Sequence, residues 1–113
     1  MTIGEWLRSR TPPAPEPLVA RVEAALGSQR SADVERAPEL LLDAAVGLLE
    51  PLLAREHAGR EAALDLLAAD ALVTYAFEAA SAHPEQLDAR TRDAMVRLAG
   101  LAPTSTERVP GRE

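Results

Sequence analysis

Residues 60–81, REAALDLLAADALVTYAFEAAS, are the longest stretch of this chain with a helical pattern. Polar side chains recur along it every three to five residues, at Glu61, Asp65, Asp70, Thr74, Glu78 and Ser81. On an α-helix this spacing gathers them on one wet face and leaves the other faces apolar. We therefore expect this helix to lie at the centre of the core, where its many alanines let neighbouring helices approach closely.

A short helix is predicted at the N-terminus. Thr2 and Glu5 have the spacing of a capping box, in which each side chain bonds the other's backbone N–H. The helix should therefore run over residues 3–10. The prolines within residues 11–15 then end it, because proline cannot continue a helix and restrains the residue before it.

A second helix is predicted over residues 16–26, whose apolar side chains fall on one stripe. Gly27 is its natural end, since glycine readily adopts the backbone conformation that closes a helix. Residues 28–36 are polar and predict a loop with room for one helical turn.

A third helix is predicted to begin at Pro38 and Glu39, because proline is favoured in the first turn and an acid stabilises the positive end of a helix. Its polar positions form one narrow stripe, made of Glu39, Asp43, Gly47 and Glu50. The remaining surface is apolar, so this helix should be mostly buried. Pro51 lies inside the pattern and is expected to kink or divide the helix, since it removes a backbone donor. Ala58 and Gly59 should end it.

The C-terminal part is predicted to hold one more helix and a tail. Residues 83–84, His-Pro, break the long helix, and a final helix should run over residues 88–99, ended by Gly100. Its expected inner face consists of Leu87, Thr91, Ala94, Met95 and Leu98. Residues 103–113 are rich in proline, serine, threonine and charge, and they predict a disordered tail.

These elements predict an all-α fold, a compact bundle of four to five helices with a short N-terminal helical arm. Residues 1–102 should form a single helical domain, in which residues 1–14 are the arm and its proline-rich connector. Hydrophobic residues make up 47% of the chain and aromatic residues only 3%, so the core must consist mainly of leucine, valine and alanine. A composition rich in alanine and leucine favours helix over strand.

The chain carries a net charge of −6, from 12 basic and 18 acidic residues. This acidity argues against binding to nucleic acid or to an anionic membrane surface, since both need a basic face. The sequence has no cysteine, no recognisable signal peptide and no apolar run of the ~18 residues that a membrane span needs. We therefore expect a cytoplasmic protein. Its basic residues are all arginine, and the lack of lysine and asparagine is typical of codon bias in a GC-rich bacterial genome.

Asp70 is the most conspicuous functional candidate, because alanines flank it and leucines lie one turn away. If its carboxylate is buried, it needs a partner, which could be Arg21 or Arg97, or else a ligand or metal. The candidate ligand site or buried polar site consists of Asp70, Thr74, Tyr75 and Glu78. In the competing interpretation, the acids of this helix and of residues 39–50 lie on solvated faces rather than around a divalent cation.

Trp6 is the only tryptophan and lies on the short helix behind a proline-rich connector. A large aromatic side chain on a mobile element is a common interface anchor. The candidate interface therefore consists of Ile3, Trp6 and Leu7. Alternatively, this arm docks onto its own bundle and closes the core.

The usual signatures of catalysis and of metal or cofactor binding are absent from the sequence. His57 and His83 each lie beside a predicted helix end, and their spacing matches neither a zinc nor a di-iron site. The serines have no nucleophile context, and the glycines are too scattered to form a phosphate-binding loop. We expect no catalytic residue, no metal ligand and no cofactor.

Residues 59–80, GREAALDLLAADALVTYAFEAA, resemble one helical region of the trans-isoprenyl diphosphate synthases, with the pattern GEA-x-AI-L-AGDALLT-x-AFE. The resemblance covers about a fifth of the chain and runs through residues 69–72, Thr74 and residues 76–78. The chain departs from the family in three ways: it has no Asp-Asp pair, it has Ala69 in place of a glycine, and it is less than half the usual length. The resemblance implies shared helix packing rather than synthase activity.

The sequence therefore predicts a small bacterial helical-bundle protein, non-enzymatic, that acts by protein–protein association and forms a homodimer. The apolar helix surface is large for so short a chain, and the Trp6 arm adds an anchor. The alternative is a bundle that binds a small apolar or diphosphate ligand near Asp70, remotely like the isoprenoid synthases.

Overall fold

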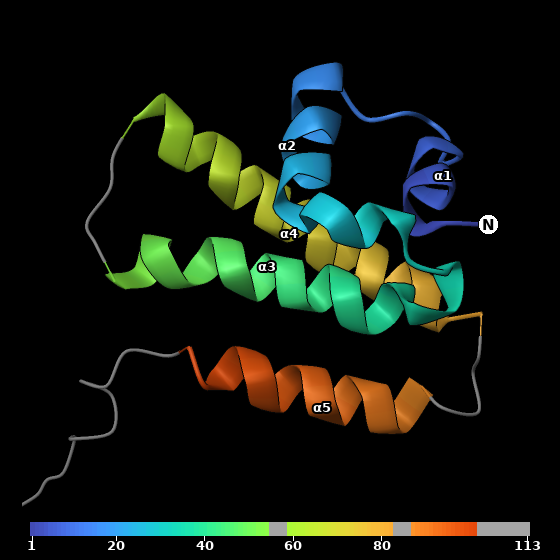
Figure 1. The fold of residues 1–113 in the computed structure, drawn as a ribbon. Helices are drawn as coiled ribbons and strands as arrows, with labels where there is room; N and C mark the ends of the chain where they lie inside the picture. The colour runs from blue at the N-terminus through green and yellow to red at the C-terminus, as the bar shows by residue number, and fades with distance from the viewer. Residues whose placement is uncertain (55–58, 83–86, 102–113) are drawn as a thin grey trace, which may run out of the picture.

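The computed structural model describes residues 1–54, 59–82 and 87–101, and within these ranges the protein is helical and contains no strand (Figure 1). The elements in chain order are α1 (Ile3–Arg8), α2 (Glu16–Leu26), the 3-10 turns η1 (Gly27–Ser31) and η2 (Val34–Arg36), α3 (Ala37–Ala54), α4 (Arg60–Ala80) and α5 (Leu87–Ala99). The prediction of an all-α bundle is confirmed. The expected tail at residues 103–113 and both histidines lie outside the described residues.

The core is built on α3 and α4, which run antiparallel and make the most extensive contact in the molecule (Figure 1). Leu41 of α3 and Leu72 of α4 are completely buried. Ala45, Ala68 and Ala69 are buried beside them, and such small side chains let the two backbones approach closely. The central place predicted for the long helix is confirmed.

Helix α3 presents its polar stripe to water as predicted, since Glu39, Asp43, Gly47 and Glu50 are all exposed. The helix continues through Pro51 to Ala54, so the expectation that Pro51 divides it is wrong. Proline leaves the carbonyl of Gly47 without its intrahelical donor. Both residues face solvent, where water can satisfy that carbonyl.

Helix α2 packs against α4 and α3 and has the predicted bounds. It buries Val22 and Leu26 on the core side. Gly27 ends it with φ 57°, in the left-handed region that favours glycine. The following polar stretch forms the two 3-10 turns, so it is more regular than the predicted loop with a single turn.

Helix α1 folds back onto the bundle. The predicted capping box is present: the Thr2 backbone N–H donates to Glu5 Oε1 (2.8 Å), and the Glu5 backbone N–H donates to Thr2 Oγ1 (3.1 Å). The Ile3 N–H donates to the carbonyl of Ala32 (2.9 Å), which ties the helix to the segment between the two 3-10 turns. Ile3 and Leu7 are buried in the common core.

An ion-pair clamp holds α1 against α2. Nε and Nη2 of Arg8 each donate to one carboxylate oxygen of Glu23 at 2.8 Å, a bidentate geometry. Glu16 receives longer bonds from the same guanidinium, at 3.3 and 3.4 Å. The hydrogen bonds from Arg8 lower the pKa of Glu23 below its ordinary value. The clamp is at its strongest when Glu23 is ionised.

Helix α5 contacts α4 and runs in the same direction as α3 (Figure 1). Ala94 is buried, and Arg97 forms an ion pair with Asp43 of α3. Met95, which was expected on the inner face, is 61% exposed, so that expectation is wrong. One residue turns a helix by about 100°, which carries Met95 to the outer side when Ala94 faces inward.

None of the described helices combines the length and the apolar composition needed to cross a bilayer.

Gly47, inside α3, and Gly27, at the end of α2, should respond oppositely to substitution by alanine. Gly47→Ala should raise the free energy of unfolding by about 0.5–1 kcal/mol, because the site is helical, exposed and open to a Cβ. Gly27→Ala should lower it by about 1 kcal/mol or more, since an alanine is strained at that positive φ. Urea denaturation of the two variants checks the signs. If both substitutions changed the free energy of unfolding in the same direction, the backbone conformations of Gly47 and Gly27 would be contradicted.

The Arg8–Glu23 clamp should make stability depend on pH in a defined direction. Because the pKa of Glu23 is lowered by folding, its stabilisation is fully present above its unfolded-state pKa of about 4.3 and is lost as the pH falls through the lower folded-state value. Glu23→Gln should therefore lower the free energy of unfolding near pH 7, and the difference from the native sequence should shrink below about pH 4. Denaturation at several pH values measures it.

The control for this prediction is the Arg8→Gln background, in which the carboxylate has lost its bidentate partner. There only Arg30, whose Nη1 is 4.0 Å from Glu23 Oε1, remains as a partner, so the effect of Glu23→Gln should be much smaller than in the native background. An effect of Glu23→Gln that does not change between neutral and acid pH would count against the clamp.

Candidate functional site

Asp70 lies on the exposed face of α4, as the polar stripe predicted, so the case of a buried carboxylate that needs a partner does not arise. Thr74 and Glu78, four and eight residues further on, are exposed as well. This spacing of four keeps the three side chains near one face of the helix. The alanines next to Asp70 therefore face other directions than Asp70 itself. Its carboxylate lies on a solvated face of the helix.

The two arginines considered as partners of Asp70 pair with other carboxylates. Arg21 of α2 donates from Nε to Oδ1 of Asp65 at 2.6 Å, and both side chains are partly buried. Arg97 of α5 pairs with Asp43 of α3. These two ion pairs join helices to one another, so the structure uses both arginines to fasten the bundle.

The four residues of the predicted site do not form one site. The Thr74 hydroxyl donates to the carbonyl oxygen of Asp70 (3.0 Å), a bond within the helix. Tyr75 is half-buried and packs against the core from another face of α4. Glu78, one turn further along, reaches the arm instead. The structure therefore separates Asp70 and Thr74 from Tyr75 and Glu78.

Tyr75 and Glu78 meet α1 and the residues after it in a group that we name the tryptophan cluster, consisting of Trp6, Arg10, Tyr75 and Glu78. The rings of Trp6 and Tyr75 pack edge to face, with centroids 6.1 Å apart and planes at 83°. The guanidinium of Arg10 lies over the Trp6 ring, 4.4 Å from its centroid, and its Nη1 is 3.5 Å from Glu78 Oε2. A cation over an indole face and a carboxylate beside it stabilise each other.

The candidate interface residues of the arm are therefore engaged within the chain. Ile3 is completely buried and Leu7 nearly so, and Trp6 is half-buried against Tyr75. The arm closes its own core, which was the alternative interpretation of Trp6. The sequence pattern already placed Arg10 on the same side of the arm as Trp6, and the contact forms although α1 ends at Arg8.

A hollow of about 460 Å³ borders the tryptophan cluster, with Trp6, Arg10, Glu35 and Glu78 among the residues that line it. It combines an aromatic wall with one cation and two carboxylates. Ser81 also lines it, but its hydroxyl donates to the carbonyl of Glu78 (2.6 Å) at the end of α4. This serine caps the helix, and its geometry is not that of an activated nucleophile.

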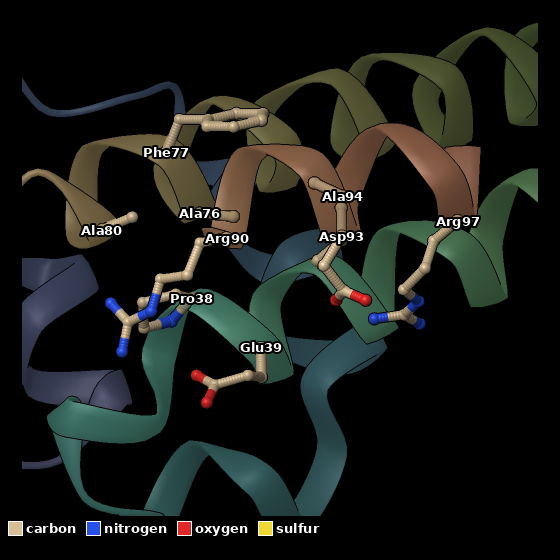
Figure 2. A pocket seen from close by; sticks show the side chains of 10 residues that line it. Pro38, Glu39, Ala76, Phe77, Ala80, Arg90, Asp93, Ala94 and Arg97 are labelled. Carbon is tan, nitrogen blue, oxygen red and sulfur yellow. The ribbon is translucent and has the colours of Figure 1, made fainter. Parts of the chain in front are cut away.

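A second cavity, which we name the three-helix pocket, lies between α3, α4 and α5 (Figure 2). Its lining residues are Pro38, Glu39, Leu42, Ala76, Phe77, Ala80, Arg90, Asp93, Ala94 and Arg97. In Figure 2 the charged ends of Arg90, Glu39, Asp93 and Arg97 lie on one side of the pocket, and Ala76, Phe77 and Ala80 on the other. The pocket is thus apolar on one side and charged at its rim.

A third feature, which we name the leucine patch, consists of Leu53, Leu66 and Leu67. These side chains are 55%, 57% and 58% exposed, which corrects the expectation that the apolar faces of α4 are buried. The first turns of α4 diverge from the last turns of α3 (Figure 1), so this end of the pair is less covered. A hollow of about 400 Å³ there is lined by Leu52, Leu53, Gly59, Ala62, Ala63 and Leu66.

Within the residues that the structure describes, no group of three or more acidic or histidine side chains gathers in a way that could hold a metal ion. The acids of α3 and α4 instead lie apart on exposed faces or in ion pairs with arginine.

Comparison with known proteins finds no match to this chain among family models, curated proteins or solved structures. The resemblance of residues 59–80 to the trans-isoprenyl diphosphate synthases is therefore a likeness within one helix. Any function has to be argued from the three surface features described above.

The tryptophan cluster should be measurable as a coupling energy between Trp6 and Tyr75. We expect Trp6→Leu and Tyr75→Leu to be non-additive, with a coupling of about 0.5–1.5 kcal/mol from the edge-to-face contact. A double-mutant cycle by urea denaturation provides the value. As a control, Trp6→Leu combined with Val96→Ala, an exposed residue of α5, should be additive. Additivity in the Trp6–Tyr75 cycle would contradict the contact.

Proposed function

We propose that the protein is a non-enzymatic interaction module that forms a homodimer through the leucine patch. The observation that carries this proposal is the exposure of Leu53, Leu66 and Leu67 at one end of the molecule. A large leucine side chain gains about 1.5–3 kcal/mol when it is moved from water into an apolar environment. Leu53 and Leu66 line one hollow and Leu67 follows Leu66 on α4, so their burial in a contact provides a driving force for association.

The shape of this end supports a second copy as the partner. Leu66 both lines the hollow and stands beside the projecting Leu67, so a hollow and a ridge occur on the same surface. A two-fold dimer places the same patch of both copies in contact, so the patch must be complementary to itself. A leucine ridge next to an apolar hollow meets that requirement.

The charge distribution supports the same location. Each chain carries a net charge of −6, so two copies repel each other over most of their surfaces. The described residues that line the hollow at the leucine patch carry no charge. Association through this patch should therefore strengthen as salt screens the repulsion, whereas a contact made of ion pairs would weaken.

This proposal moves the dimer contact away from the arm. Ile3, Trp6 and Leu7 pack within their own chain, and the leucine patch offers more exposed apolar surface. The alternative function, ligand binding near Asp70, receives no support from the position of that residue on a solvated face. For the setting we propose the bacterial cytoplasm, which the arginine-rich, lysine-free and cysteine-free composition favours.

The dimer should dissociate when the leucine patch is made acidic. Leu66→Glu with Leu67→Glu places four glutamates in the dimer interface, two from each copy, and should weaken association by about a hundredfold or more. Both residues are exposed in the single chain, so helicity should stay unchanged. Sedimentation equilibrium at several salt concentrations measures the association.

The matched control is Met95→Glu with Val96→Glu, since these residues are 61% and 66% exposed on α5. The control should dimerise like the native sequence. A native protein that stays monomeric at high micromolar concentration refutes the dimer, and dissociation by the control alone refutes the leucine patch as its contact.

A further inference from the structure

Arg90 lines the three-helix pocket and carries one nitrogen without a partner. Its Nη1 is closed off from water, and no hydrogen-bond partner for it occurs among the described residues. A guanidinium stays protonated at any ordinary pH, and a charged donor removed from water without an acceptor is unfavourable. An acceptor oxygen brought to this guanidinium would therefore be stabilised there.

Among the described residues, a second arginine nitrogen without a hydrogen-bond partner belongs to a guanidinium whose charge is balanced. Nε of Arg10 also lacks a partner, but the same guanidinium lies over Trp6 and pairs through Nη1 with Glu78. The charge of Arg10 is thus balanced within the tryptophan cluster. Among the described residues, Arg90 makes no such ion pair.

Two carboxylates stand at the same rim. Glu39 of α3 and Asp93 of α5 line the pocket with Arg90, and their charged ends lie on the same side of it (Figure 2). Arg97, the other cation there, is already paired with Asp43. The rim therefore offers one cation for an anionic group and two carboxylates for a cationic group. A ligand with only an anionic group would be repelled by the two carboxylates, and a ligand with only a cationic group would be repelled by Arg90.

The remaining wall is apolar and small. Leu42, Ala76, Phe77 and Ala80 contribute to it from α3 and α4. The cavity has a volume of about 40 Å³, and a single water needs roughly 10–15 Å³ on the same measure. A branched side chain of three or four carbons is of the size that this space can receive, with its polar end at the rim.

We propose that the three-helix pocket binds a small apolar α-amino acid in its zwitterionic form. The carboxylate of the ligand accepts from Arg90, its ammonium group lies toward Glu39 and Asp93, and its side chain enters between Phe77 and Leu42. This binding is separate from the homodimer, because the leucine patch and the pocket share no described lining residue.

Valine tests the proposal, with two analogues that each lack one charged group. 3-Methylbutanoate keeps the carboxylate and the side chain, and isobutylamine keeps the amine and the side chain. We expect valine to shift the methyl resonances of Ala76, Ala80 and Ala94 in NMR spectra of the full chain, with a dissociation constant of about 1–10 mM. Each analogue should bind at least about tenfold more weakly, because it leaves one side of the rim unmatched.

Variants test which pocket residues bind the carboxylate of the ligand and which bind its ammonium group. Arg90→Gln should abolish the shifts, and Arg92→Gln, an exposed arginine on the same helix that does not line the pocket, should preserve them. Glu39→Gln with Asp93→Asn changes only exposed residues and should remove the preference for valine over 3-methylbutanoate. Circular dichroism shows that each variant is folded.

Three results would overturn the proposal: no shift of these methyls with valine at about 20 mM, unchanged binding by Arg90→Gln, or 3-methylbutanoate binding as tightly as valine to the native chain. If Arg90→Gln fails to fold, the double variant of Glu39 and Asp93 decides the matter, since an unchanged preference for valine there also refutes it.

Discussion

The close approach of α3 and α4 is the contact on which the other elements depend. Leu41 and Leu72 are fully buried between them, and alanines on both helices keep the backbones near each other. With one tryptophan, one tyrosine and one phenylalanine in 113 residues, the chain has few bulky side chains with which to fill a wide gap. The other helices pack on the remaining surface of this pair. Helices α1 and α2 contribute buried apolar residues, and α5 contributes one buried alanine and an ion pair.

Local patterns predicted the elements well, because the signals that end helices are local. The capping box at Thr2 and Glu5 and the glycine at 27 are in the chain where the structure uses them. Of the two outcomes expected at Pro51, the division of the helix does not occur, because its missing N–H matters little where the carbonyl of Gly47 faces water. The period of the polar residues placed Asp70 on the exposed face, and the structure has it there.

The candidate sites were less predictable, because each needs elements that lie far apart in the chain. The tryptophan cluster joins Trp6 and Arg10 to Tyr75 and Glu78, and that meeting depends on how the connector after α1 turns back. The three-helix pocket exists only where α5 lies beside α3 and α4. Leu66 and Leu67 are exposed because the neighbouring helices do not cover that part of α4. The apolar pattern of one helix does not predict how far its neighbours extend.

Helix α5 buries little of its surface against the rest of the protein, and this has a consequence for sequence variation. Among its described side chains only Ala94 is buried, so substitutions along this helix disturb little of the core. Yet α5 supplies four of the residues around the three-helix pocket, including both arginines. Selection can therefore vary the chemistry of that rim almost independently of foldability. A substitution on α5 can thus change the pocket rim and leave the buried α3–α4 contact as it is.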